Sequence, residues 1–195
     1  MAIAESEEKV DGRYFCITFD DGLKNCVTNA LPILLEQNAP AAFFIVTKFI
    51  GTSPEKDREL AQSFFDDHEV TVEFMTWDDC RTLSRAGMTV GSHTVSHRVL
   101  SSLSPEDVER ELRESKVRIE AELGIECRHF CAPVGTPDRD FIVNRDPLIA
   151  ARLGYKSFLT TQRGSASRPL QPHFIERDHV LPSWDAYQLR YFFSR

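Results

Sequence analysis

Residues 14–22 read Tyr-Phe-Cys-Ile-Thr-Phe-Asp-Asp-Gly, an apolar run that ends in two carboxylates and a glycine. The apolar part predicts a strand, and the residues after it predict a helix over 27–36 and a second strand over 41–46. A strand, a helix and a strand in this order open a parallel α/β sheet. Asp20 and Asp21 are then expected at the carboxyl end of the first strand, where such folds gather their functional groups.

The rest of the chain continues the alternation of short apolar runs and amphipathic stretches. Charged residues dominate an excursion over 51–72, in which we expect one short helix. Further strands are expected at residues 88–91, 128–131, 156–161 and 173–180, and further helices at 76–85, 104–123, 147–153 and 184–193. We therefore predict a flexible segment over 1–12 and one α/β domain over 13–195 with a mainly parallel sheet.

Two of these helices carry recognisable start signals. Thr76 precedes the first with an acidic residue, Asp79, three positions later, which predicts a capping box. Ser104 followed by proline starts the longest helix, and Gly124 ends it. The candidates for its apolar face are Val108, Leu112, Val117, Ile119 and Leu123.

Composition excludes several functional classes. The 195 residues carry a net charge of -7 and no block of Lys or Arg, so a nucleic-acid partner is not expected. The longest strongly apolar stretch, residues 40–46, is too short to span a bilayer, and the N-terminus lacks the pattern of a signal peptide. Five irregularly spaced cysteines indicate reduced thiols, and we expect a cytoplasmic protein.

Two histidines complete the pattern begun by the paired aspartates. Residues 92–97 read Ser-His-Thr-Val-Ser-His and follow the strand expected at 88–91, at the same edge of the sheet. Imidazoles four residues apart, together with a carboxylate, suit a divalent transition metal. We predict that Asp21, His93 and His97 bind one divalent ion, with Zn as the leading candidate and Co, Ni, Fe or Mn as alternatives. Turn carboxylates beside a pair of surface histidines are the competing interpretation.

The two aspartates are expected to divide their roles. Adjacent carboxylates do not easily bind one ion together, and a bound ion lowers the pKa of a water molecule. If Asp21 binds the ion, Asp20 is free to accept the proton of that water as a general base. The sequence therefore indicates a hydrolase with one metal ion.

At this point the motifs resemble those of the polysaccharide deacetylase family, also called the NodB-homology domain or carbohydrate esterase family 4. The resemblance extends from about Arg13 to the C-terminus and is supported by residues 75–78, 103–116 and 129–135. It implies a distorted (β/α) barrel with about seven parallel strands. It also implies hydrolysis of a linear amide bond, by which a metal-dependent enzyme removes an N-acyl group, usually acetyl, from an amino sugar.

The resemblance also assigns roles to residues. Asp20 matches the family's base, Pro133 lies in the motif that walls the substrate groove, and three positions match the metal ligands, namely Asp21, His93 and His97. The chain departs from the family at Cys131, where an arginine that orients the base is usual. The base of this chain is therefore expected to have a different partner.

Other residues of the chain could replace the family groups that are missing. Arg177 would replace the missing cation, or contribute to substrate binding, if its strand ends at the same edge of the sheet; an ordinary surface ion pair is the alternative. The family's late Leu-x-His motif, whose histidine protonates the leaving amine, has no clean copy in the chain. His179 is the first candidate for this acid and His173 the second, while a surface histidine is the alternative for either.

The leading hypothesis is a metal-dependent N-deacetylase that acts on an amino sugar in a glycan or a glycan precursor. Without a recognisable export signal, the expected substrate is an intermediate of glycan assembly. Two alternatives remain, which are an amidohydrolase for a small non-sugar amide and a degenerate barrel that binds glycan without catalysis. The oligomeric state is left open.

Overall fold

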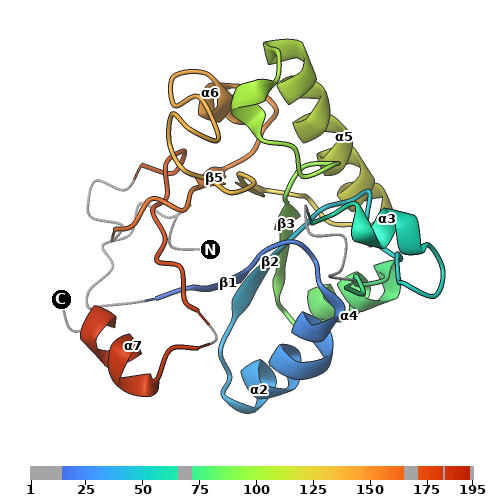
Figure 1. The fold of residues 1–195 in the computed structure, drawn as a ribbon, viewed down its shortest axis with the longest axis vertical. Helices are drawn as coiled ribbons and strands as arrows, with labels where there is room; N and C mark the ends of the chain where they lie inside the picture. Colours follow the sequence, from blue (N-terminus) through green and yellow to red (C-terminus); the bar gives the residue numbers. More distant parts are fainter. Residues whose placement is uncertain (1–14, 66–71, 165–170, 182, 194–195) are drawn as a thin grey trace.

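The computed structural model describes residues 15–65, 72–164, 171–181 and 183–193, so the segment expected to be flexible lies outside the described residues. Five parallel strands form one sheet in the order of the sequence. These are β1 (Ile17–Phe19), β2 (Ala41–Ile45), β3 (Thr89–Ser92), β4 (His129–Cys131) and β5 (Ser157–Leu159). The sheet is curled (Figure 1), and because all its strands are parallel, their carboxyl ends share one edge.

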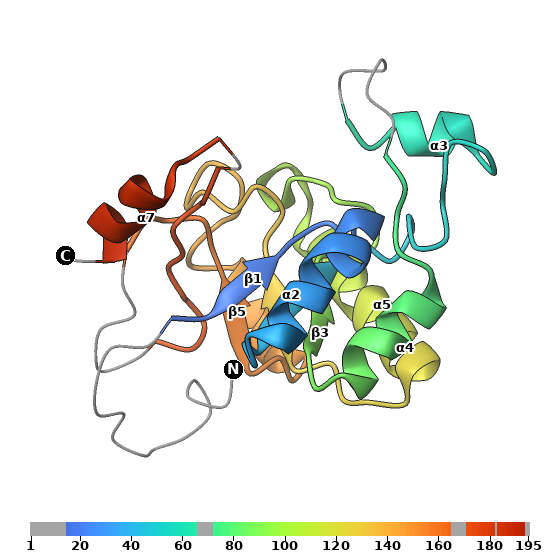
Figure 2. The same cartoon turned by 90° about the horizontal axis from the view of Figure 1, so that it is seen from below.

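Helices cover the outside of the curled sheet. A π-helical turn, η1 (Cys26–Ala30), leads into α2 (Leu31–Glu36), and a 3-10 turn, η2 (Leu100–Ser102), precedes α5. The other helices are α3 (Arg58–Gln62), α4 (Trp77–Arg85), α5 (Pro105–Leu123), α6 (Asp146–Arg152) and α7 (Ala186–Phe193). In Figure 1, α2, α4, α5 and α6 form an arc around the sheet, whereas Figure 2 shows α3 projecting from the body.

The helix signals predicted from the sequence are confirmed. The Thr76 hydroxyl accepts a hydrogen bond from the Asp79 amide, and the Asp79 carboxylate accepts one from the Thr76 amide. Ser104 caps α5, and Gly124 ends it with a φ of 67°, which glycine adopts without strain.

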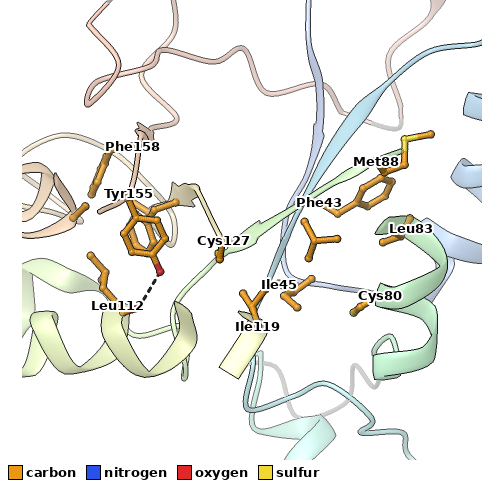
Figure 3. Close-up of a cluster of buried hydrophobic side chains, with 14 of the residues drawn as sticks. Phe43, Ile45, Cys80, Leu83, Met88, Leu112, Ile119, Cys127, Tyr155 and Phe158 are labelled. Carbon is orange, nitrogen blue, oxygen red and sulfur yellow. Dashed lines mark hydrogen bonds between the residues drawn. The ribbon is translucent and has the colours of Figure 1, made fainter. Parts of the chain in front are cut away.

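Alternate residues of β2 pack on opposite sides of the sheet. Phe43 and Ile45 belong to the large core beneath α4 and α5, which Figure 3 shows, whereas Phe44 belongs to a small cluster inside the curl with Cys131. Gly91 permits this packing, because a Cβ atom there would lie 2.6 Å from the Phe44 ring. A helix-covered outer face and a narrow inner face are the two sides of a half-barrel.

Three expectations need correction or qualification. Val117 is 58% exposed, and the buried face of α5 contains Ser115 in its place, because Val117 lies on the opposite side of the helix from Leu112 and Ile119. Residues 173–180 form no regular strand, although Ile175 makes a parallel bridge to Leu159 beside β5. The described residues contain five strands, so a count of seven is not confirmed.

All five cysteines are free, and three of them, Cys80, Cys127 and Cys131, are buried. Among the described residues, no helix is long and apolar enough to cross a membrane.

Candidate active site

Predicted site residues from separate segments meet at the carboxyl edge of the sheet. Asp20 and Asp21 directly follow β1, and His93 directly follows β3. The His93 amide donates a hydrogen bond to the Ile45 carbonyl at 2.9 Å, which anchors this histidine to the end of β2. The strand order therefore brings together residues that are more than seventy positions apart in sequence.

Asp21 faces both predicted histidines. Its Oδ1 atom lies 3.4 Å from Nε2 of His93 and 3.3 Å from Nε2 of His97. These three groups form a cluster that could hold a metal ion. A tetrahedral ion with bonds of about 2.0–2.1 Å keeps its ligands roughly 3.3 Å apart, so the spacing of Asp21 from the two imidazoles fits zinc.

The other ring nitrogen of His93 supports the same assignment. Its Nδ1 atom lies 2.8 Å from the carbonyl oxygen of Cys131, which can only accept a hydrogen bond. Nδ1 must therefore carry a proton, and in the neutral ring Nε2 offers its lone pair toward Asp21. A carbonyl partner of this kind is usual for histidines that bind metals.

Electrostatics favour a cation at this cluster. Burial would raise the pKa of Asp21, but hydrogen bonds from His93 and His97 hold it far below its ordinary value. Burial would lower the pKa of His93, yet its hydrogen bond with Asp21 and the charge of Asp20 keep it well above its ordinary value. The negative charge of Asp20 and Asp21 that favours this proton also favours a bound cation, which would displace the proton from His93.

Asp20 has a different partner. Nη1 of Arg177 donates to Oδ1 of Asp20 at 2.9 Å, and Nη2 donates to Oδ2 at 2.8 Å, which makes a two-bond pair. Burial would raise the pKa of Asp20, but the charges of His93 and Arg177 lower it below its ordinary value. Asp20 is therefore held as a carboxylate in a fixed orientation.

Arg177 also joins the two edge strands of the sheet. Its Nε donates to the Thr160 carbonyl just after β5 at 2.8 Å, and its Nη1 donates to the Thr18 hydroxyl in β1 at 2.9 Å. The Sγ atom of Cys131 lies 2.9 Å from Nη2 of the same guanidinium. The guanidinium thus occupies the inside of the curl directly beside Asp20.

A second group of potential ligands is formed by Asp20, His93 and Cys131. The Arg177 guanidinium contacts both Asp20 and Cys131, so a metal ion there would meet a positive charge at close range. The cluster around Asp21 is the better cation site.

The remaining candidates lie apart from these contacts. His179 is exposed in the segment after β5, and among the described interactions none joins it to Asp20. His173 lies near the amino end of β5, where its Nε2 meets the Tyr155 carbonyl at 3.1 Å. Pro133 is buried after β4, and the exposed residue of that turn is Val134, with a φ of 59°.

Sequence reasoning missed two contributors at this edge. Glu111 of α5 binds the loop between the two histidines, and Thr18 binds Arg177. Glu111 lies inside a stretch that supported the family resemblance, but nothing in its spacing indicated a role. Both contributions depend on tertiary contacts, which no local sequence pattern predicts.

Comparison with known proteins decides the family. The family model described as polysaccharide deacetylase matches residues 7–158. The chain belongs to this family. It is 27% identical over 177 residues to the "Putative polysaccharide deacetylase YxkH" of Bacillus subtilis, covering 90% of the chain and 54% of that protein. It is also 27% identical over 110 residues to a "Chitooligosaccharide deacetylase" of Rhizobium leguminosarum bv. trifolii, covering 56% and 40%.

The solved structures agree with this polysaccharide deacetylase fold. The Streptococcus pyogenes deacetylase PplD, in complex with acetate, superposes with a TM-score of 0.76 at 23% identity, covering 98% of the chain and 75% of PplD. The chain spans about half the length, or less, of the two curated relatives. The comparison confirms the expected (β/α)-barrel class of fold, in the form of a curled half-barrel.

Proposed function

We propose that this polysaccharide deacetylase domain is a hydrolase that removes N-acetyl groups from amino sugars in a glycan, using one divalent ion, with zinc as the first candidate. The observation that carries the proposal is the division of the two adjacent carboxylates. Asp21 Oδ1 lies within 3.4 Å of Nε2 of both His93 and His97, whereas both oxygens of Asp20 accept hydrogen bonds from Arg177. One carboxylate is thus available for the ion and the other for proton transfer.

Asp21, His93 and His97 would hold the ion. When bound, a divalent ion polarises the acyl carbonyl and lowers the pKa of a water molecule. The donor set of one carboxylate and two imidazoles leaves coordination positions open for substrate and water, as catalytic zinc sites require.

Asp20 is assigned the role of general base. Its carboxylate accepts a proton from the attacking water, the amide C–N bond breaks, and the products are acetate and a free amino sugar. His179, which is exposed two residues after Arg177, is the first candidate for the acid that protonates the leaving amine. Arg177 fixes the direction of the Asp20 carboxylate, so that little reorientation is needed when the substrate binds.

A chitooligosaccharide is the first substrate to test, since a relative is named for that substrate class. Acetate release would be measured from oligomers of N-acetylglucosamine with zinc-loaded protein and with protein stripped by a chelator. We expect release that requires the metal. If no N-acetyl sugar is hydrolysed but a small formamide or cyclic imide is, the amidohydrolase alternative replaces this proposal.

A further inference from the structure

The loop between the two predicted metal-binding histidines has an unusual backbone. Thr94 and His97 both adopt positive φ angles, of 71° and 62°. A β-branched residue rarely adopts this conformation, and such a conformation persists only where surrounding contacts impose it. Within the loop, the His97 amide donates a hydrogen bond to the Thr94 hydroxyl at 2.9 Å. The rest of this backbone is held near Asp21 by contacts from outside the loop.

One side of the loop is held by the segment after β2. The Thr47 amide donates to the Thr94 carbonyl at 3.2 Å, and the Lys48 amide donates to the Val95 carbonyl at 2.9 Å. These bonds engage the carbonyl groups of the loop, but its amides at Val95 and Ser96 point elsewhere.

The other side of the loop is held by Glu111 of α5. Its Oε2 atom accepts hydrogen bonds from the Val95 and Ser96 amides, both at 2.9 Å. Its Oε1 atom accepts a hydrogen bond from the Ser96 hydroxyl at 2.6 Å. One carboxylate thus satisfies three donors of the loop, with the strength that a charged acceptor gives.

The helix that carries Glu111 is itself fixed. Ser115, one turn further along, accepts a hydrogen bond from the Ser92 hydroxyl at 2.8 Å, directly before His93. The Leu112 carbonyl accepts one from the buried Tyr155 hydroxyl at 2.9 Å (Figure 3). One face of α5 therefore holds the chain both before and after His93.

We propose that Glu111 is a positioning residue for the metal centre, which fixes the loop so that His97 lies opposite Asp21 before any ion binds. This proposal rests on the proposed function, which assigns the ion at this site to catalysis. Glu111 itself is no ligand, because both of its oxygens bind the loop. Its removal should therefore weaken metal binding without removing any donor atom from the site.

The test is the zinc affinity of apo protein, measured by competition with a chromophoric chelator. We expect Glu111→Ala to weaken zinc binding by roughly 10- to 100-fold, the effect usual for residues that support metal ligands. Glu111→Gln, which keeps an acceptor oxygen for the two amides, should stay close to wild type. Glu114→Gln, at an exposed glutamate on the same helix, is the matched control and should bind zinc as wild type does.

Circular dichroism would establish that each variant is folded. If Glu111→Ala does not fold, Glu111→Asp carries the test, because it retains the charge but shortens its reach, and it should bind zinc about 10-fold more weakly. The proposal would be overturned if folded Glu111→Ala bound zinc as tightly as wild type. If only Glu111→Asp folds, the same result for that variant would overturn it. A wild-type protein that binds no zinc would overturn it as well.

A second readout separates this proposal from the proposed function. Saturating zinc should restore acetate release by Glu111→Ala, because all three ligands remain, and a loss that persists at saturating zinc would count against the positioning role. If the wild type releases no acetate from any N-acetyl sugar but the order of zinc affinities holds, the deacetylase proposal fails while the role of Glu111 stands.

Discussion

Asp20 and Asp21 are neighbours in sequence, but their partners come from very different places in the chain. Asp21 meets His93 and His97, which belong to one short motif. Asp20 meets Arg177, 157 positions away, and Cys131, 111 positions away. We call Asp21, His93 and His97 the proposed metal side, and Asp20, Arg177 and Cys131 the proposed base side. The metal side is formed by a local motif placed against β1, whereas the base side depends on a contact that joins the two edges of the sheet. Variants of the two sides should therefore respond differently to added metal.

The largest effect is expected on the metal side. His97→Ala removes a donor atom, so zinc affinity should fall by more than the roughly 10- to 100-fold typical of supporting residues. Acetate release should be lost at ordinary zinc concentrations. His173→Ala is the matched control, because His173 contacts only the Tyr155 carbonyl in the described interactions. Equal zinc binding by the two variants, measured by chelator competition, would contradict the ligand assignment.

His179→Ala tests the acid and should have the next largest effect. General acid catalysis contributes roughly 10²- to 10⁴-fold, and an exposed site lets water replace part of it, so a loss of about 10²-fold in kcat is expected. Zinc content should not change. Steady-state kinetics with an N-acetylglucosamine oligomer would measure the loss, and an unchanged kcat would remove His179 from the mechanism.

Arg177→Ala separates the base side from the metal side. Without its two hydrogen bonds, the Asp20 carboxylate loses its fixed direction, and kcat should fall by about 10²-fold, as misplacement of a catalytic group typically causes. KM and zinc content should be nearly unchanged, and added zinc should not restore the rate. Arg163→Ala, which breaks an exposed ion pair with Asp178, is the control and should keep wild-type kinetics. If added zinc restored kcat of Arg177→Ala, the metal side and the base side would not be independent.

Cys131→Ser is expected to have the smallest effect. Burial raises the pKa of the Cys131 thiol, so it stays protonated at neutral pH and can donate to Oδ2 of Asp20 at 3.5 Å. A serine hydroxyl offers the same donor and an acceptor for Arg177. Kinetics should stay close to wild type. A large loss of kcat would mean that the sulfur atom itself is needed.

Much of the metal side could be predicted from the sequence, because its information is local. The four-residue spacing of His93 and His97, and their position after a strand, were sufficient to place them opposite Asp21. The capping box at Thr76 was predictable for the same reason, since its two partners lie three residues apart.

The base side could be predicted only as a conditional statement. Arg177 was predicted to reach Asp20 if the strand expected over residues 173–180 ended at the carboxyl edge of the sheet. The structure has a single bridge at Ile175 instead, and the Arg177 amide donates to the Gln162 carbonyl at 2.9 Å. Pairing outside regular strands leaves no periodic pattern in the sequence. Glu111 and Thr18 lie in a regular helix and a regular strand, but their side chains contact segments that only the tertiary fold brings near them, so these contacts could not be foreseen either.

The central claim is that Asp21 holds the ion and Asp20 acts on the water. The most direct measurement is the zinc content of Asp20→Asn and Asp21→Asn after equilibrium dialysis, with acetate release measured on the same samples. The account predicts one zinc ion per chain in Asp20→Asn without acetate release, and little zinc in Asp21→Asn. Loss of zinc from both variants to the same degree, or acetate release at the wild-type rate by Asp20→Asn, would contradict it.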